Sequence, residues 1–234
     1  MSDVAVSPGT DPYRVGHHPH APGHGHGHGH GHGHPGDDAT GHGEGGPASK
    51  RVVVAYGFWI FLLSDIVMFS AFFATYAVLV DATAGGPTGR ELFGLTRVAI
   101  ETAALLTSSF ACGLAMIASQ VRNHLWTQIG LLATGLLGFV FLVLEVQEFA
   151  LMIAEGAGPA RSAFLSAFFA LVGLHGLHVF SGLLWLGTMM AQVAVKGFHP
   201  RILRRLMCFS LFWHALDIIW VALFTVVYLI GTTS

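Results

Sequence analysis

Five long apolar stretches constrain the fold of this chain more than any other feature. They cover roughly residues 52–80, 98–121, 125–154, 162–195 and 206–230, and none contains a lysine or arginine. A helix needs about 20 apolar residues to cross the hydrocarbon core of a bilayer, so each stretch is long enough for one crossing. Membrane β-strands would show alternating segments of about ten residues, whereas these runs are continuous. With 53% hydrophobic and only 10% charged residues, the chain is predicted to be an all-α, polytopic membrane protein, a bundle of five transmembrane helices in residues 50–234.

Residues 1–49 form a leader of different composition, rich in Gly, Pro and His. Gly alternates with His from His24 to His34, a pattern that can bury no apolar surface, so the leader is predicted to be a disordered tail. Imidazoles bind zinc, copper and nickel, and weak metal binding by this tail is one interpretation; a solvated extension without function is the other. The candidate ligands are His24, His26, His28, His30, His32 and His34. The leader lacks the apolar segment of a cleavable signal peptide, so we expect the first span to direct insertion.

The orientation follows from the basic residues in the short connections. Eight lie on the side of the amino terminus: Arg14, Lys50, Arg51, Arg122, Lys196, Arg201, Arg204 and Arg205. Three lie on the other side: Arg90, Arg97 and Arg161. Because cytoplasmic loops carry the excess of basic residues, we expect a cytoplasmic amino terminus and a periplasmic carboxyl terminus in a bacterial inner membrane.

The spans carry ionisable residues in a repeated spacing. Three spans have pairs three positions apart, Glu145 with Glu148, His175 with His178, and His214 with Asp217, and two spans have one carboxylate each, Asp65 and Glu101. Residues at i and i+3 share one face of a helix. A charge inside a bilayer costs several kcal/mol (about 3 on insertion scales), so these eight side chains are the candidate functional groups.

Depth divides these groups into two layers. At a rise of about 1.5 Å per residue, Asp65 and the His175 pair lie roughly 20 Å deep, and His214 and Asp217 reach about 12–17 Å from the inside. Glu101 begins its span and the Glu145 pair ends its span, so these carboxylates are expected toward the outer leaflet. Because no span contributes a Lys or Arg, each carboxylate must be protonated, bonded to a His or hydroxyl, exposed to water, or paired with a partner outside the chain.

Several chemistries fit these residue types. The strings EVQE, HGLH and HALD supply carboxylates and imidazoles from three helices, as metal-binding bundles do, but the Glu and His pairs fall on different helices at different depths. A proton path is a second reading, since His and carboxylates form relays in membranes. A hydrogen-bonded network that fixes helix packing or holds lipid headgroups is the third. We therefore expect no metal site within the spans.

At the level of whole strings, the sequence resembles subunit III of the haem-copper terminal oxidases. The resemblance is carried by GFWIFLLSDIVMFSAFFATYAVLV from Gly57, LEVQEF from Leu144, LSAFFALVGLHGLHVFSGLLWL from Leu165 and SLFWHALDIIWVALFTVVYLIG from Ser210. The five-span length and the loop DATAGGPTG from Asp81 resemble the cytochrome o ubiquinol oxidase branch. The cytochrome c oxidase form carries two further spans at its start, and a glutamate where this chain has Asp65.

The resemblance implies a noncatalytic subunit of a proton-pumping ubiquinol oxidase complex in the respiratory chain, which reduces oxygen to water. It implies no cofactor in this chain, haem and copper in the partner subunit I, subunits II and IV in the same complex, and phospholipid bound between helices; no nucleic acid is expected. The eight intramembrane groups would then be structural, lipid-facing or partner-facing, and no residue is assigned a catalytic or cofactor-binding role. The alternatives are a membrane metal-dependent enzyme, or a proton or cation transporter, built on the His and Glu pairs.

Overall fold

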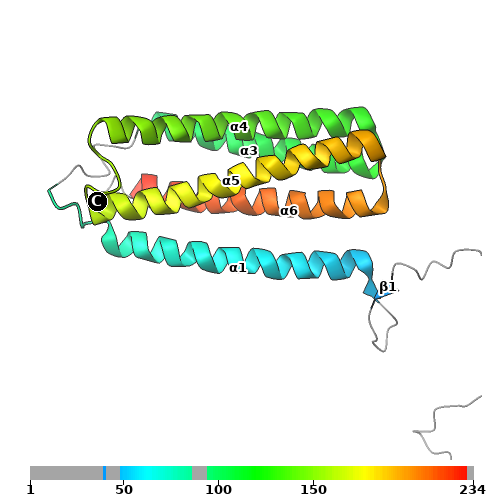
Figure 1. Cartoon of the computed structure of the whole chain (residues 1–234), viewed down its shortest axis with the longest axis horizontal. Helices are drawn as coiled ribbons and strands as arrows, with labels where there is room; N and C mark the ends of the chain where they lie inside the picture. The colour runs from blue at the N-terminus through cyan, green and yellow to red at the C-terminus, as the bar shows by residue number, and fades with distance from the viewer. Residues whose placement is uncertain (1–38, 41–47, 86–93, 231–234) are drawn as a thin grey trace, which may run out of the picture. The chain divides into compact units, whose positions relative to one another are not determined.

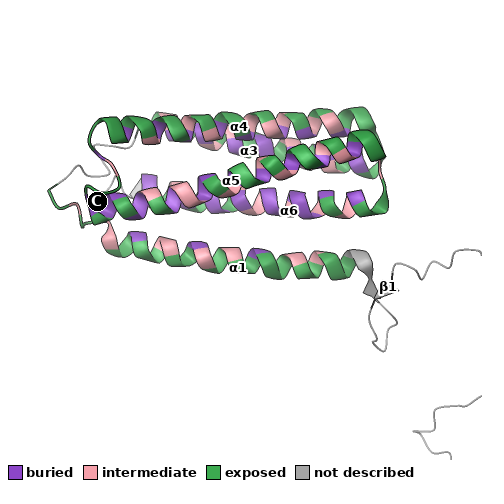
Figure 2. Ribbon diagram, viewed as in Figure 1, coloured by how far each residue is buried: buried purple, intermediate pink, exposed green. Residues whose placement is uncertain are grey.

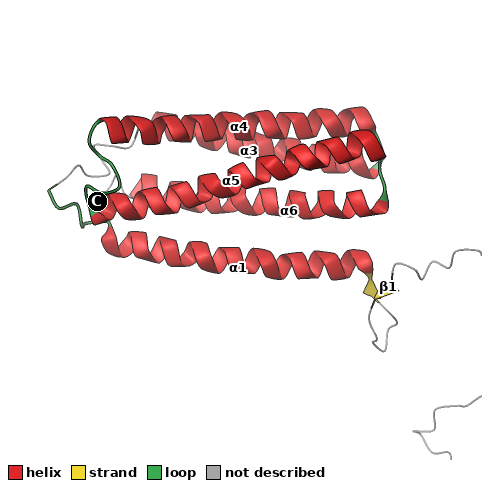
Figure 3. Ribbon diagram, in the orientation of Figure 1, coloured by secondary structure: helices red, strands yellow, loops and turns green. Residues whose placement is uncertain are grey.

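The computed structural model describes residues 39–40, 48–85 and 94–230, and long helices account for most of them. The helices are α1 (Lys50–Leu79), α3 (Leu95–Gln120), α4 (His124–Ala154), α5 (Ala163–Lys196) and α6 (Pro200–Leu223), the last continued by the π-helical turn η2 (Phe224–Ile230). All five long helices are apolar enough and long enough to cross a membrane (Figures 1 and 3). The predicted five-span, all-α fold is confirmed.

Two helices begin more than two residues before the spans predicted for them. Helix α6 begins at Pro200 and α3 at Leu95, where the hydropathy pattern placed the starts at 206 and 98. The missed turns contain arginines, which a hydropathy reading excludes from a span. A long arginine side chain can nevertheless lie in a helix that emerges from the hydrocarbon, because its guanidinium reaches the headgroup region. Proline also suits the first turn of a helix, where its missing N–H costs nothing.

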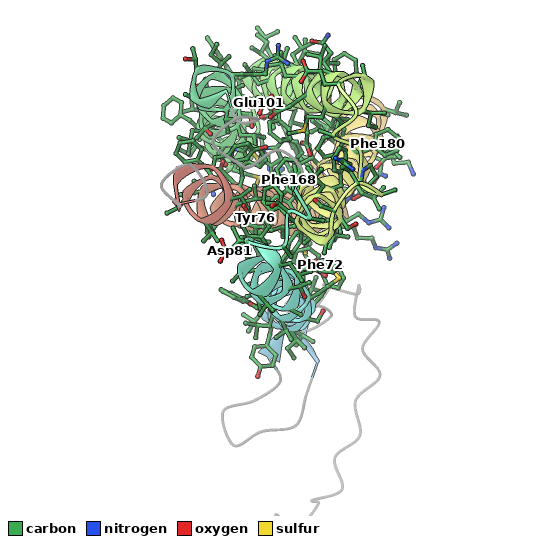
Figure 4. The ribbon with its side chains drawn as sticks, turned by 90° about the vertical axis from the view of Figure 1, so that its left-hand side faces the viewer. Phe72, Tyr76, Asp81, Glu101, Phe168 and Phe180 are labelled. Atoms are coloured by element: carbon green, nitrogen blue, oxygen red, sulfur yellow. The ribbon has the colours of Figure 1, made fainter. Side chains whose placement is uncertain are left out.

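Helices α3 to α6 form a four-helix bundle in which each helix packs against two neighbours: α3 on α4, α4 on α5, α5 on α6 and α6 on α3. Helix α1 packs against α5 and α6, outside this bundle (Figure 1). The view along the helices shows α1 below the other four (Figure 4). Helices α3 and α4 approach closely, since a Cβ at Gly130 would lie 2.8 Å from the Cβ of Ala115.

Helix α1 contacts the bundle through a stripe of residues spaced three and four apart. Leu62, Phe69 and Tyr76 are buried on this stripe, and Phe58 packs against the core. The remaining faces of α1 and the outer faces of the bundle expose large apolar side chains (Figure 2). In a soluble protein such surface would be a liability, whereas acyl chains cover it in a membrane.

The helix ends carry the expected signals. Asn123 caps α4 by accepting a hydrogen bond from the Trp126 N–H at 3.3 Å, and Ser162 caps α5 by accepting one from Leu165 at 3.2 Å. Helix α5 stops at Gly197, whose φ of 65° is a left-handed conformation that glycine adopts without strain. Asn123 thus lies in the connection between α3 and α4, Ser162 in that between α4 and α5, and Gly197 in that between α5 and α6.

Two two-residue strands precede α1. Strands β1 (Ala39–Thr40) and β2 (Ala48–Ser49) pair antiparallel, Ala39 with Ser49 and Thr40 with Ala48. They belong with the helices to one compact unit, Asp38–Ser234. These four residues belong to the leader that was predicted to be disordered, and in the structure they are paired. The rest of the leader, with the candidate histidine ligands from His24 to His34, falls outside the described residues, so its disorder and its metal binding stay predictions.

Candidate functional site

The three glutamates converge in the interior of the bundle. Glu101 comes from α3 and Glu145 and Glu148 from α4, and all three are buried, Glu101 completely. They lie close enough to interact electrostatically with one another and with Tyr228 of η2. Figure 4 shows Glu101 among the helices. The carboxylate oxygens of Glu101 and Glu145 are buried and accept no hydrogen bond within the described part of the chain.

Arg97 gives this acidic cluster a basic neighbour. It lies in the first turn of α3, one turn before Glu101, and interacts electrostatically with Glu101 and Glu148. Helix α3 thus contains a basic residue, which the span predicted from residue 98 leaves out. Helix α3 begins before the predicted span, and residues four apart lie one above the other on a helix, so Arg97 lies on the same side of α3 as Glu101.

Gly176 of α5 makes room for one member of the cluster. A Cβ at this position would lie 3.0 Å from Oε1 of Glu145. The Glu145 carboxyl therefore lies directly against the α5 backbone, next to His175. The E-x-x-E and H-G-L-H strings meet here, although they occupy different helices.

His175 is fully buried and surrounded by aromatic rings from three other helices. Its ring centroid lies 6.3 Å from Phe69 of α1, 5.8 Å from Phe141 of α4 and 5.1 Å from Trp220 of α6. Neither ring nitrogen has a hydrogen-bond partner among the described residues. His175 thus acts as a packing residue where four helices meet.

His178 lies one turn further along α5 and is half-buried. Its Nδ1 bonds to the Leu174 carbonyl oxygen at 2.8 Å, and its ring lies 5.2 Å from Phe69. Phe69 therefore contacts both histidines, which places the pair on the side of α5 that faces α1. The shared face predicted from the i and i+3 spacing is the contact with α1.

His214 and Asp217 form a third group, on the part of α6 that meets α3. Oγ of Ser109 on α3 shares a hydrogen bond with Nδ1 of His214 at 3.0 Å. Asp217 interacts electrostatically with His214 and with the Ser109 hydroxyl, and its Oδ1 is buried with no hydrogen-bond partner in the described segments. Sequence reasoning missed Ser109, because a lone serine in an apolar helix normally bonds its own backbone.

Asp65 occupies the middle of α1 on the stripe that faces the bundle, between Leu62 and Phe69. It is half-buried, and no hydrogen bond or ion pair to it occurs in residues 48–85 and 94–230. The groups predicted to form a central layer therefore do not form one cluster. They lie at α1, between α1 and α5, and between α3 and α6. The predicted separation of the Glu and His pairs by depth does not hold for Glu145, which lies against Gly176, next to His175.

Metal ligation finds no support in this geometry. Within the described ranges, no group of three or more His, Cys, Asp or Glu side chains is arranged to hold a metal ion. The rings of His175 and His178 pack against aromatic side chains, and the glutamates interact electrostatically with one another, Arg97 and Tyr228.

A groove at the cytoplasmic end expected from the basic residues lies between α1, α5 and α6. It has a volume of about 390 Å³. Apolar and aromatic side chains line one part and guanidinium groups the other: Val54, Phe58, Trp185, Cys208, Arg201, Arg204 and Arg205. Arg205 also donates a hydrogen bond to Oε1 of Gln192 at 3.0 Å. This combination suits an amphiphile with an acidic headgroup.

Comparison with known proteins agrees with the sequence resemblance. A family model described as cytochrome c oxidase subunit III matches residues 37–232. The cytochrome bo(3) ubiquinol oxidase subunit 3 of Pseudomonas aeruginosa is 53% identical over 176 residues, which cover 75% of this chain and 84% of that protein. The quinol oxidase subunit 3 of Bacillus subtilis is 43% identical over 175 residues, covering 75% and 86% of the two chains. The cytochrome c oxidase subunit 3 of Bacillus sp. (strain PS3) is also 43% identical over 175 residues, covering 75% and 84%.

Proposed function

Because the chain belongs to the cytochrome c oxidase subunit III family, we propose that it is the noncatalytic third subunit of a cytochrome o-type ubiquinol oxidase. The whole complex would oxidise ubiquinol, reduce oxygen to water and pump protons across a bacterial inner membrane. Haem and copper would lie in subunit I, with subunits II and IV in the same assembly. The observation that carries the proposal is the similarity to the Pseudomonas aeruginosa ubiquinol oxidase subunit 3, which exceeds the similarity to the cytochrome c oxidase subunit 3 above, 53% against 43%.

In this role the eight intramembrane groups are contacts. The glutamate cluster with Arg97 joins α3 to α4, and the ring of His175 with its aromatic neighbours joins α5 to α1, α4 and α6. Such groups fix the relative positions of helices because leaving them unpaired in hydrocarbon is costly. An enzyme or transporter built on the same pairs is not favoured, since the family is that of an oxidase subunit.

The proposed orientation has the amino terminus in the cytoplasm. Arg122, Lys196 and Arg201 follow or precede helix ends that lie at the same end of the bundle as the start of α1 (Figure 1). The basic residues of short loops concentrate on the cytoplasmic side of membrane proteins. The groove with its three arginines would then open at the cytoplasmic leaflet.

The same groove is the proposed phospholipid site. A guanidinium group binds a phosphate through two parallel hydrogen bonds, and Phe58 and Trp185, whose centroids lie 5.9 Å apart, would cover an acyl chain. Replacement of Arg201 and Arg205 by Gln should reduce the phospholipid that remains bound to the purified complex. Native mass spectrometry measures this loss.

Purification tests the main proposal. The chain, tagged at its carboxyl terminus and extracted in mild detergent, should bring along a larger subunit with a haem spectrum and with ubiquinol-dependent oxygen consumption. A chain that purifies alone, or that itself carries a Soret band, would overturn the proposal.

A further inference from the structure

We draw no further inference here: the strongest candidate, the apolar groove between α4 and α5 that is lined by Glu145, Phe149, Gly176 and Phe180, carries none, because the carboxylate oxygens of Glu145 are buried beneath its surface and nothing in the structure shows what covers it.

Discussion

Trp213 of α6 is held between glycines of two other helices, and this contact allows a quantitative test of the bundle. A Cβ at Gly138 of α4 would lie 2.7 Å from Cη2 and 2.8 Å from Cζ2 of the indole, and one at Gly182 of α5 would lie 3.1 Å from Cζ3. The indole Nε1 donates a hydrogen bond to Oγ of Ser108 at 3.0 Å. The ring therefore cannot move away from α4 without meeting α5 or losing its acceptor.

The perturbation is Gly138→Ala. Carbon atoms pack at about 3.6 Å, so the new methyl group would force the ring or the helix to shift by about 0.9 Å, the difference between about 3.6 Å and the 2.7 Å contact. Overpacking of this kind costs about 1–3 kcal/mol. Replacement of Gly by Ala within a helix by itself raises the free energy of unfolding by up to about 1 kcal/mol. The free energy of unfolding of Gly138→Ala should therefore lie about 1–3 kcal/mol below that of a Gly→Ala control without the clash.

Gly187→Ala is the matched control, because Gly187 lies inside α5 and a Cβ there would meet nothing within 4 Å. The assay is unfolding of the purified chain in mixed micelles by titration with a denaturing detergent, followed by tryptophan fluorescence. Trp213→Phe removes the two ring atoms that Gly138→Ala would strike, so Gly138→Ala should cost less in that background. If Gly138→Ala proves as stable as Gly187→Ala, the contact between α4 and Trp213 is not the one described here.

Three further predictions concern polar groups. Ser108→Ala should lower the free energy of unfolding by about 1–3 kcal/mol, because the buried Trp213 N–H loses its acceptor; Ser70→Ala, an exposed serine that bonds only its own helix, should change little, and equal effects would contradict the reasoning. Arg97→Gln should lower the melting temperature of the complex more than Arg161→Gln does, since Arg97 is the cation beside the buried glutamates; scanning calorimetry would refute this by giving equal shifts. Titration calorimetry with zinc should show binding to the full chain and none after deletion of the Gly/His-rich leader; no heat with either protein would reject metal binding by the tail.

The convergence of the three glutamates could be anticipated from the sequence. Helices α3 and α4 are joined by residues 121–123, so they must run antiparallel, and the start of α3 lies beside the end of α4. Glu101 is near that start, and Glu145 and Glu148 are near that end. A fixed rise per residue then places all three at a similar depth. Both the depth of these residues and the connection between their helices can be read from the sequence.

Arg97 could not be found in the same way. A span predicted from hydropathy ends at the first charged residue. The helix itself can extend further, to a residue where a cap or water satisfies its terminal backbone groups. The three residues by which α3 exceeds its predicted start contain Arg97, which interacts with Glu101 and Glu148. A four-residue spacing search across predicted boundaries, from Arg97 to Glu101, would have detected it.

The depth of a residue in its span does not say which neighbouring helix the residue faces. Asp65 and Asp217 illustrate this. Each lies near the middle of its span, at residues 52–79 and 200–228, so sequence depth assigned both to one layer. The period of α1 places Asp65 on the stripe with Leu62 and Phe69, facing α5 and α6, whereas Asp217 faces α3 beside Ser109. Which neighbour each stripe meets depends on how five helices surround one another, and that arrangement is decided by contacts such as Gly138 with Trp213. The two carboxylates therefore lie in different surroundings, Asp65 on the face of α1 that meets the bundle and Asp217 beside Ser109 of α3.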